Sequence, residues 1–270
     1  MPTGLTQRRG ASRPDAPKVC YATPVKNSHV AAEVKVAVLL VAGAGTRLGD
    51  PAGRPKSLVE IAGRSMLVRA AEQLRAVGVE HLVLATGYRE EAIVHAAANL
   101  GMATSFCRND AYATTQNAVS LLRCAPAIGD ASFFKLDGDV LFQREVLLRL
   151  LQTDGQIAAA VDTGAALADE EMKVYVQDEC ITHFGKGLDP LRSAGESIGI
   201  ERVDASVAAQ LFDALARAER EGRTNLYYED VYQELIDQGV KAGVADVTDL
   251  PWIEVDTRED LARATELFGA

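Results

Sequence analysis

The sequence predicts an α/β fold, a three-layer sandwich around a mostly parallel sheet with a small hairpin-containing region beside it. Short apolar runs alternate with stretches in which apolar residues recur at helical spacing. The first of these runs, Val36–Val41, has no polar residue, which is typical of a strand covered by helices on both faces. A chain of 270 residues that is 48% hydrophobic is long enough to bury such a sheet in one large domain.

The first half of the chain predicts a regular alternation of strands and helices. The run Val36–Val41, the helical pattern from Met66 to Val77 and the apolar run His81–Ala85 form a β-α-β unit. The pattern continues with helices at residues 90–100, 115–123 and 144–151 and strands at residues 103–107, 132–136 and 157–161. Alternation of this kind is typical of a parallel sheet with helices on both faces.

The second half predicts a different order of elements. The segments Lys173–Gln177 and Ile181–Phe184 lie on either side of a short polar stretch, which predicts a hairpin. Beyond it the pattern predicts strands at residues 197–203 and 240–247, helices at 205–221 and 227–238, and an extended segment at 252–256. Thr257 and Asp260 have the spacing of a capping box, so a last helix is expected after them.

A glycine-rich loop follows the first strand. Gly43, Gly45 and Gly49 let the backbone turn tightly and approach a ligand closely. Consecutive backbone N–H groups turned into a concavity bind anions, and Arg47 and Lys56 add cations suited to phosphate. The loop therefore predicts a site for a polyphosphate.

This loop differs from two common phosphate-binding loops. The dinucleotide fingerprint requires glycine where this chain has Leu48, and the Walker loop requires a glycine before its lysine, whereas Lys56 follows Pro55. The pattern that is present, G-x-G-T-R-L, a spacer and P-K-S-L, resembles the nucleotidyltransferases that activate sugar phosphates and phospho-alcohols. It is most similar to the phosphocholine, inositol-phosphate and phosphonate cytidylyltransferase branch. The resemblance implies a Rossmann-like nucleotidyltransferase domain at residues 35–270.

The resemblance also implies a reaction between two phosphate-bearing substrates. An oxygen of the acceptor phosphate attacks the α-phosphorus of a nucleoside triphosphate and releases pyrophosphate, so cations must offset the repulsion between the two anions. The catalytic residues expected are Arg47, Lys56 and Lys186, the last in the segment FGKGL. The nucleotide-binding residues expected are loop residues and amide or hydroxyl side chains of the segment TTQNAVSLL: Val41, Ala42, Gly43, Ala44, Gly45, Thr46, Arg47, Gln116, Asn117 and Ser120.

Acidic residues follow the central strand and recur near the end of the chain. Asp139 stands two residues beyond Asp137, where ligands of open α/β sheets bind, and Glu254 and Asp256 alternate along an extended segment. Carboxylates are preferred ligands of Mg²⁺. The resemblance assigns Asp139 and Asp256 to Mg²⁺, with Glu254 sharing the second position. The alternative is that Asp137 and Asp139 are turn residues and Asp256 a polar residue before a helix.

The acceptor side is expected in the segments ESIGIERVD and YYED. The acceptor-binding residues implied are Lys186, Glu196, Tyr228 and Glu229. Aromatic rings with an acid can hold a quaternary ammonium by cation–π contact, but core packing explains the tyrosines equally well. Phosphocholine, inositol phosphate and an aminoethylphosphonate therefore all remain open as acceptors.

Composition limits the partners and the compartment. A net charge of −10 and a pI near 5.0 argue against nucleic-acid binding. Four cysteines without metal-ligand spacing, and no apolar run approaching a membrane span, lead us to expect a cytoplasmic enzyme without membrane contact. Residues 1–34, with scattered Pro, Gly, Ser and charges, are expected to be a disordered tail. The expected partners are CTP and a small phosphorylated substrate, and a homodimer is left open.

Three other functions stay in consideration. The first is a sugar-1-phosphate nucleotidyltransferase that uses UTP, dTTP or GTP. The second is a nucleotide-sugar glycosyltransferase in which Asp137-Gly138-Asp139 is a D-x-D motif, although this leaves Arg47 and Lys56 without a role. The third is a nucleotide-binding module without catalytic activity.

Overall fold

The computed structural model describes residues 33–45, 48 and 53–269. All but the last two residues of the expected tail, 1–34, lie outside these ranges, as do Thr46 and Arg47 of the glycine-rich loop. Among the described residues, no helix combines the length and apolar character needed to cross a membrane.

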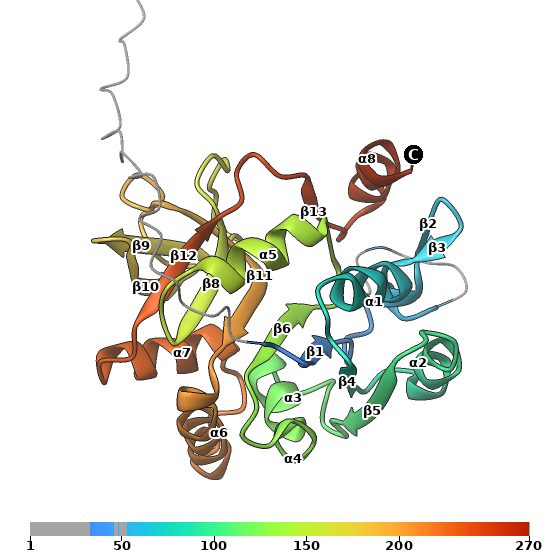
Figure 1. Cartoon of the computed structure of the whole chain (residues 1–270), viewed down its shortest axis with the longest axis horizontal. Coiled ribbons are helices and arrows are strands. Elements are labelled where there is room, and N and C mark those ends of the chain that lie inside the picture. Colours follow the sequence, from blue (N-terminus) through green and yellow to red (C-terminus); the bar gives the residue numbers. More distant parts are fainter. Residues whose placement is uncertain (1–32, 46–47, 49–52, 270) are drawn as a thin grey trace, which may run out of the picture. The chain divides into compact units, whose positions relative to one another are not determined.

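The first half of the chain forms the parallel part of a nine-stranded sheet (Figure 1). Its strands, in spatial order, are β5 (Ala103–Arg108), β4 (His81–Thr86), β1 (Val36–Leu40) and β6 (Phe133–Asp137), and neighbouring strands pair in parallel. The helices between them are α1 (Met66–Ala76), α2 (Glu90–Ala97), α3 (Asn117–Arg123) and α4 (Ala125–Ile128). The strands and the three longer helices were predicted from the sequence, and α4 was not.

The second half of the chain makes the sheet mixed. The long strand β11 (Gly195–Val203) runs antiparallel to β6 on one side and to β8 (Ile157–Asp162) on the other. Beyond β8 lie β12 (Ala242–Asp246), parallel to it, and the hairpin of β10 (Cys180–Gly185) and β9 (Lys173–Gln177). Strand β9 also pairs with the start of β11, so this half curls back on itself. The prediction of a mostly parallel sheet therefore holds for the first half only, because β10 and β11 run opposite to their neighbours.

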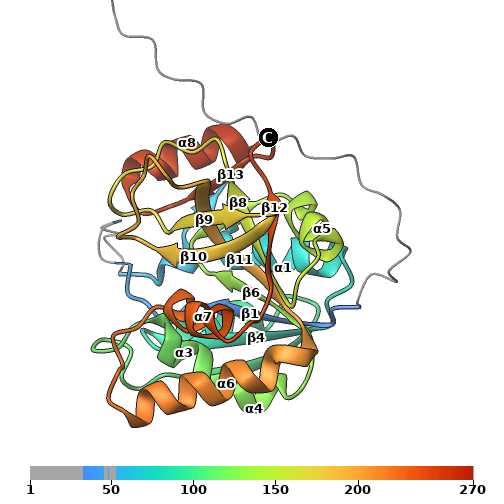
Figure 2. The same cartoon turned by 90° about the vertical axis from the view of Figure 1, so that its left-hand side faces the viewer.

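Helices cover both faces of the sheet, and each face has its own core. Successive residues of β1 point to opposite faces of the sheet and so belong to different cores. Leu39 packs in the core with α1 and α5 (Arg144–Gln152), and Val38 packs in the core with α3 and α6 (Ala205–Arg220). Helix α7 (Tyr228–Asp237) joins the second core. In Figure 2, α3 and α6 lie below the sheet and α1 and α5 above it.

A small two-stranded sheet links the middle of the chain to its end. Strand β7 (Val140–Phe142) pairs antiparallel with β13 (Trp252–Glu254), and helix α8 (Arg258–Phe268) follows. The expected capping box is present, since Thr257 and Asp260 each accept a hydrogen bond from the other's backbone N–H. Beneath it, a third core packs Ile253 and Val255 against Val59, Ile61 and Met66. These residues lie in and beside a short hairpin of β2 (Glu60–Ile61) and β3 (Arg64–Ser65), which follows the 3₁₀ helix η2 (Lys56–Leu58). The pairing of β7 with β13 was not predicted from the sequence.

Candidate active site

Two adjoining cavities open where β1 and β6 end. The smaller lobe has a volume of about 370 Å³ and the larger lobe about 690 Å³. They share the lining residues Leu40, Gly43, Gln116, Gly138, Asp139 and Asp256. The glycine-rich loop and the acidic residues therefore meet in one crevice at the carboxyl ends of the parallel strands, as expected for an open α/β sheet.

The described part of the glycine-rich loop borders both lobes. Val41 and Gly45 line the smaller lobe, and Ala42 lines the larger one, whereas Ala44 lines neither. Gly45 has a φ of +61°, and a Cβ there would also collide with the stem of Lys56. Only glycine satisfies both conditions, so the loop can lie directly over the lysine.

Lys56 lies between two carboxylates. Its Nζ is 2.8 Å from Oδ2 of Asp139 and also donates a hydrogen bond to Oδ1 of Asp256. The lysine side chain is 11% exposed. Burial opposes its charge, but Asp139 and Asp256 outweigh this and raise the pKa of Lys56, so the ammonium stays charged.

Asp139, Glu254 and Asp256 form a carboxylate cluster. Ligand oxygens of the three residues lie within 4.8 Å of one another. The pairing of β7 with β13 places Val140 opposite Glu254, and the backbone N–H of Val255 donates to the carbonyl of Asp139 at 2.9 Å. Burial, together with Asp139 and Asp256, raises the pKa of Glu254 to about 8.

The carboxylate cluster has the donor set of a hard divalent cation. Lys56 pairs with Asp139 and Asp256 but not with Glu254, and a bound cation would offset the repulsion among the three carboxylates. Ser57 lines the smaller lobe, and its Oγ is buried without a hydrogen-bond partner in the described part of the chain. A buried hydroxyl without a partner is costly, and it suits a ligand that supplies one.

The start of α3 presents polar side chains to the larger lobe. Gln116, Asn117 and Ser120, the residues proposed from the sequence to bind the nucleotide, all line it. The carbonyl Oδ1 of Asn117 accepts a hydrogen bond from the backbone of Tyr228 at 3.0 Å, and Ser120 Oγ accepts one from Asn109 at 3.0 Å. Gln116 is exposed, and its side chain makes no hydrogen bond within the described ranges, so its amide is available to a ligand.

The far side of the larger lobe carries both charge signs. Lys186, Glu196 and Glu229, the residues proposed from the sequence to bind the acceptor, line it. Lys186 Nζ lies 3.7 Å from a carboxylate oxygen of Glu170 and 5.1 Å from the ring centroid of Tyr227. Burial and the neighbouring acids Glu171 and Asp162 raise the pKa of Glu196 to about 7.

Tyr228 lies beneath the lobe and not in its wall. Its side chain is fully buried, and its hydroxyl donates to Oδ2 of Asp137 at 2.9 Å. The ring faces Lys135, whose Nζ lies 3.4 Å from the ring centroid. The expectation that Tyr228 touches an acceptor is therefore corrected, because the start of α7 turns its ring toward the sheet and leaves Tyr227 at the cavity.

A buried ion cluster supports this wall. Lys135 on β6 is fully buried, with its Nζ 2.7 Å from Oε2 of Glu201, 3.4 Å from Oδ1 of Asp137 and 3.1 Å from the carbonyl of Gly199. Burial opposes the charge, but the neighbouring carboxylates raise the pKa of Lys135. Sequence reasoning missed Lys135, although a lysine inside the apolar run SFFKL was the available signal. It also missed several residues that line the larger lobe: Tyr112, Glu171, Ser197, Tyr227 and Trp252.

The two lobes together can hold two anions. Lys56 offers a cation to a polyphosphate in the smaller lobe, and Lys186 offers a second cation in the larger lobe. The shared wall at Asp139 and Asp256 is where the two anions would meet.

Comparisons with known proteins agree with this geometry. A family model described as the MobA-like NTP transferase domain matches residues 37–236. The CMP-5'-(3-aminopropyl)phosphonate synthase of Streptomyces rubellomurinus is 33% identical over 256 residues, covering 86% of this chain and 38% of that protein. The bifunctional IPC transferase and DIPP synthase of Rubrobacter xylanophilus is 30% identical over 234 residues, covering 86% of this chain and 51% of that protein. The chain thus spans about half the length of these relatives, or less.

A solved structure supports the fold. The inositol-1-phosphate CTP transferase from T. maritima superposes with a TM-score of 0.76 at 23% identity, covering 88% of this chain and 96% of that one. The fold is thus the Rossmann-like fold of nucleotidyltransferases. Since the family model matches more than half of the sequence, the chain belongs to the MobA-like NTP transferase family of nucleotidyltransferases, as the glycine-rich loop predicted.

Proposed function

We propose that this protein is a Mg²⁺-dependent cytidylyltransferase that couples CTP to a small phosphorylated alcohol or phosphonate and releases pyrophosphate. The observation that carries the proposal is the convergence of Lys56, Asp139, Glu254 and Asp256 beside the glycine-rich loop. Lys56 and Asp256 are 200 positions apart in the chain and form an ion pair in the smaller lobe.

The reaction forms one bond and breaks one. An oxygen of the acceptor phosphate or phosphonate bonds to the α-phosphorus of CTP, and the bond from that phosphorus to the bridging oxygen of pyrophosphate breaks. The glycine-rich loop binds the triphosphate through its backbone N–H groups, and Lys56 offsets charge that develops in the transition state. Asp139, Asp256 and Glu254 would hold Mg²⁺, which supplies further neutralisation of phosphate charge when bound. Arg47 is proposed as a second loop cation on the resemblance alone.

The preference for CTP is supported by the larger lobe and by the relatives. Gln116 offers an amide with a donor and an acceptor to a base edge. One relative is named a CMP-phosphonate synthase, and the solved structure is named a CTP transferase. A site that accepts a hydrogen bond from the cytosine amino group would lose about 1–3 kcal/mol with UTP, which corresponds to roughly tenfold or more in selectivity.

The D-x-D glycosyltransferase alternative fits the side chains less well. In a D-x-D motif both acids serve the metal and the sugar nucleotide, but Asp137 accepts a hydrogen bond from Tyr228 and lies beside the buried Lys135. Asp139 alone of the two joins the carboxylate cluster.

A pyrophosphate-release screen tests the proposal. CTP, UTP, dTTP, ATP and GTP are each combined with phosphocholine, phosphoethanolamine, inositol phosphate, aminoethylphosphonate and hexose 1-phosphates in the presence of Mg²⁺. We expect release that depends on CTP and on an alcohol phosphate or phosphonate. Equal or better release from UTP or dTTP with glucose 1-phosphate would contradict the assignment to cytidylyl transfer but leave the family unchanged.

A further inference from the structure

The acceptor region of the larger lobe is rich in acids. Its acidic wall consists of Asp137, Glu170, Glu171, Glu196 and Glu229. Within the described ranges, Lys186 is the only cationic residue that lines this lobe. An acceptor that carries only a phosphate or phosphonate would be repelled by such a wall, whereas one with a separate positive charge would be attracted to it.

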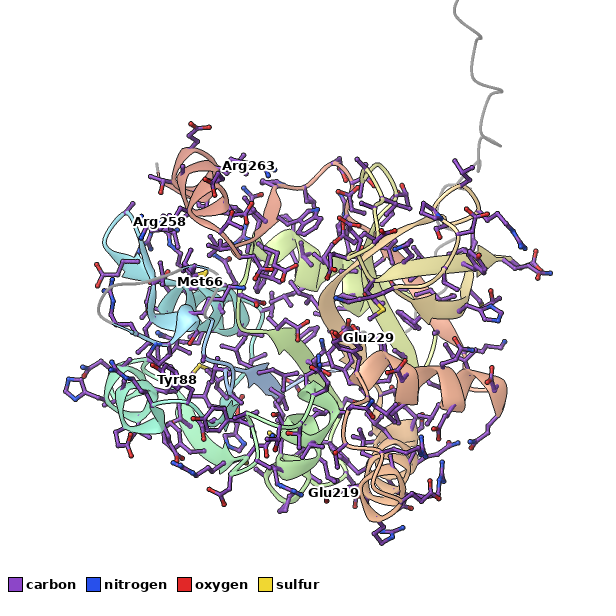
Figure 3. All side chains as sticks on the ribbon, turned by 180° about the vertical axis from the view of Figure 1, so that it is seen from behind. Met66, Tyr88, Glu219, Glu229, Arg258 and Arg263 are labelled. Atoms are coloured by element: carbon purple, nitrogen blue, oxygen red, sulfur yellow. The ribbon has the colours of Figure 1, made fainter. Side chains whose placement is uncertain are left out.

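Glu229 is the most buried member of the acidic wall. It is 4% exposed, and its Oε2 has no hydrogen-bond partner among the described residues. Figure 3 shows it in the interior, at the start of α7. By contrast, the Glu170 side chain is 84% exposed, and Glu171 accepts a hydrogen bond from the backbone of Ala168 at 2.7 Å.

The nearby buried lysine is already engaged. Lys135 donates to the carbonyl of Gly199 and pairs with Glu201 at 2.7 Å and Asp137 at 3.4 Å. Burial, together with Asp137 and Glu201, raises the pKa of Glu229 to about 8 even with Lys135 close by. The described residues thus supply fewer cations than this group of carboxylates can bind, and an incoming cation would pair with the carboxylate that lacks one.

The kind of cation follows from the missing contact. A buried carboxylate oxygen without a partner, beside further carboxylates, favours a hydrogen-bond donor that also carries positive charge. A protonated amine has both properties, whereas a quaternary ammonium has no N–H and a hydroxyl has no charge. Two tyrosine rings near the wall already face protein cations, Tyr228 with Lys135 and Tyr227 with Lys186. They are therefore poorly placed to form an aromatic cage around a trimethylammonium group.

We infer that the acceptor carries a protonated primary amine, and that Glu229 binds this amine while Lys186 and Lys56 attract the phosphate or phosphonate at its other end. This inference rests on the proposed function and specifies the class of its acceptor. Glu229 is then a specificity-determining residue, because a neutral acceptor brings no positive charge to its buried carboxylate.

Matched acceptors test the inference on the unmodified full-length protein. With CTP and Mg²⁺, kcat/KM is measured for 2-aminoethyl phosphate against propyl phosphate, and for 2-aminoethylphosphonate against propylphosphonate, pairs that differ in an amine or a methyl group. We expect the amine to be favoured about 10- to 100-fold, the range of a charge-assisted hydrogen bond. Phosphocholine, which has the charge but no N–H, should fall below 2-aminoethyl phosphate.

A variant pair locates the effect. Glu229→Gln should lower the ratio of amine to neutral acceptor about tenfold, mainly through the KM of the amine. Glu234→Gln is the matched control, because Glu234 lies on the same helix but pairs with Arg217 and Arg223, and it should keep the ratio. If Glu229→Gln does not fold, the acceptor series with the unmodified protein decides alone.

The outcomes separate two failures. Turnover of neutral acceptors as fast as their amines, a preference for phosphocholine, or an unchanged ratio in folded Glu229→Gln would overturn the inference alone. Absence of pyrophosphate release with CTP and every acceptor, amine or neutral, would overturn the proposed function and the inference with it.

Discussion

The smaller lobe is built from short segments at strand ends, whereas the acceptor region of the larger lobe is built from side chains on a mixed, curled half of the sheet. In the smaller lobe, Gly45 and Lys56 come from one continuous motif. In the acceptor region, Lys186, Glu196 and Glu229 come from separate elements, and a buried lysine supports the wall. Under the proposed function, the smaller lobe would perform the chemistry common to the family, and the larger lobe would set what this chain accepts.

The carboxylate cluster should give the largest effect on activity. Asp139→Asn and Asp256→Asn should each lower kcat by about a thousandfold, because an amide gives up the charge that would hold the cation. Activity should also be lost in EDTA and return with Mg²⁺. Asp213→Asn, an exposed position on α6, is the control and should retain activity. Full activity in EDTA would remove the cluster from the reaction.

Lys56→Ala should have the next largest effect. We expect kcat to fall about a hundredfold with a small change in nucleotide affinity, because a contact that strengthens as charge develops acts on the transition state. Removal of the ammonium also leaves the carboxylate cluster without its internal cation, so Mg²⁺ should raise the Tm of this variant more than that of the unmodified protein. Normal turnover would show that Lys56 does not stabilise the transition state. Equal Tm shifts would show that it does not neutralise the carboxylate cluster.

Lys186→Ala should affect the acceptor and spare the nucleotide. Lys186 is 36% exposed and lies next to Tyr227, so its loss should raise the KM of the acceptor about tenfold with little change in the KM of CTP. Steady-state kinetics with each substrate varied in turn measure both. An equal rise in both KM values would contradict the division between the two lobes.

The buried acids should produce the smallest effect, a dependence of stability on pH. Burial raises the pKa of Glu229 to about 8 and of Glu201 to about 7, both above the ordinary value of 4.5. The folded state therefore binds more protons than the unfolded state in this window, and stability falls as the pH rises from about 5 to about 8. We expect a lower free energy of unfolding at pH 8 than at pH 5, measured by urea denaturation. Glu229→Gln should make the free energy of unfolding depend less on pH. An unchanged dependence would show that Glu229 does not cause it.

The sequence was sufficient to predict the features that depend on a local pattern of residues. The parallel strands and the glycine-rich loop could be predicted because apolar runs and glycine spacing are contiguous signals. Asp139 and Asp256 could be proposed as partners only through the family resemblance. Their contact depends on the register of β7 with β13, two three-residue strands that are too short to leave a pattern.

The sequence was less informative where burial decides a residue's role. Tyr227 and Tyr228 are adjacent in the chain, and only the folded backbone shows that the first faces the cavity and the second packs against Lys135. The curled half of the sheet depends on the antiparallel strand β11, whose direction an apolar run does not reveal. The acceptor region was therefore predicted as a segment and not as a set of contacts.

Identification of the product tests the central claim most directly. The protein is incubated with CTP, Mg²⁺ and 2-aminoethylphosphonate or an alcohol phosphate, and the nucleotide products are identified by mass while pyrophosphate is measured. The account predicts a cytidine monophosphate conjugate of the acceptor in equal amount to pyrophosphate, and neither product from Asp256→Asn. Hydrolysis of CTP without any conjugate, or a conjugate formed equally well by Asp256→Asn, would contradict it.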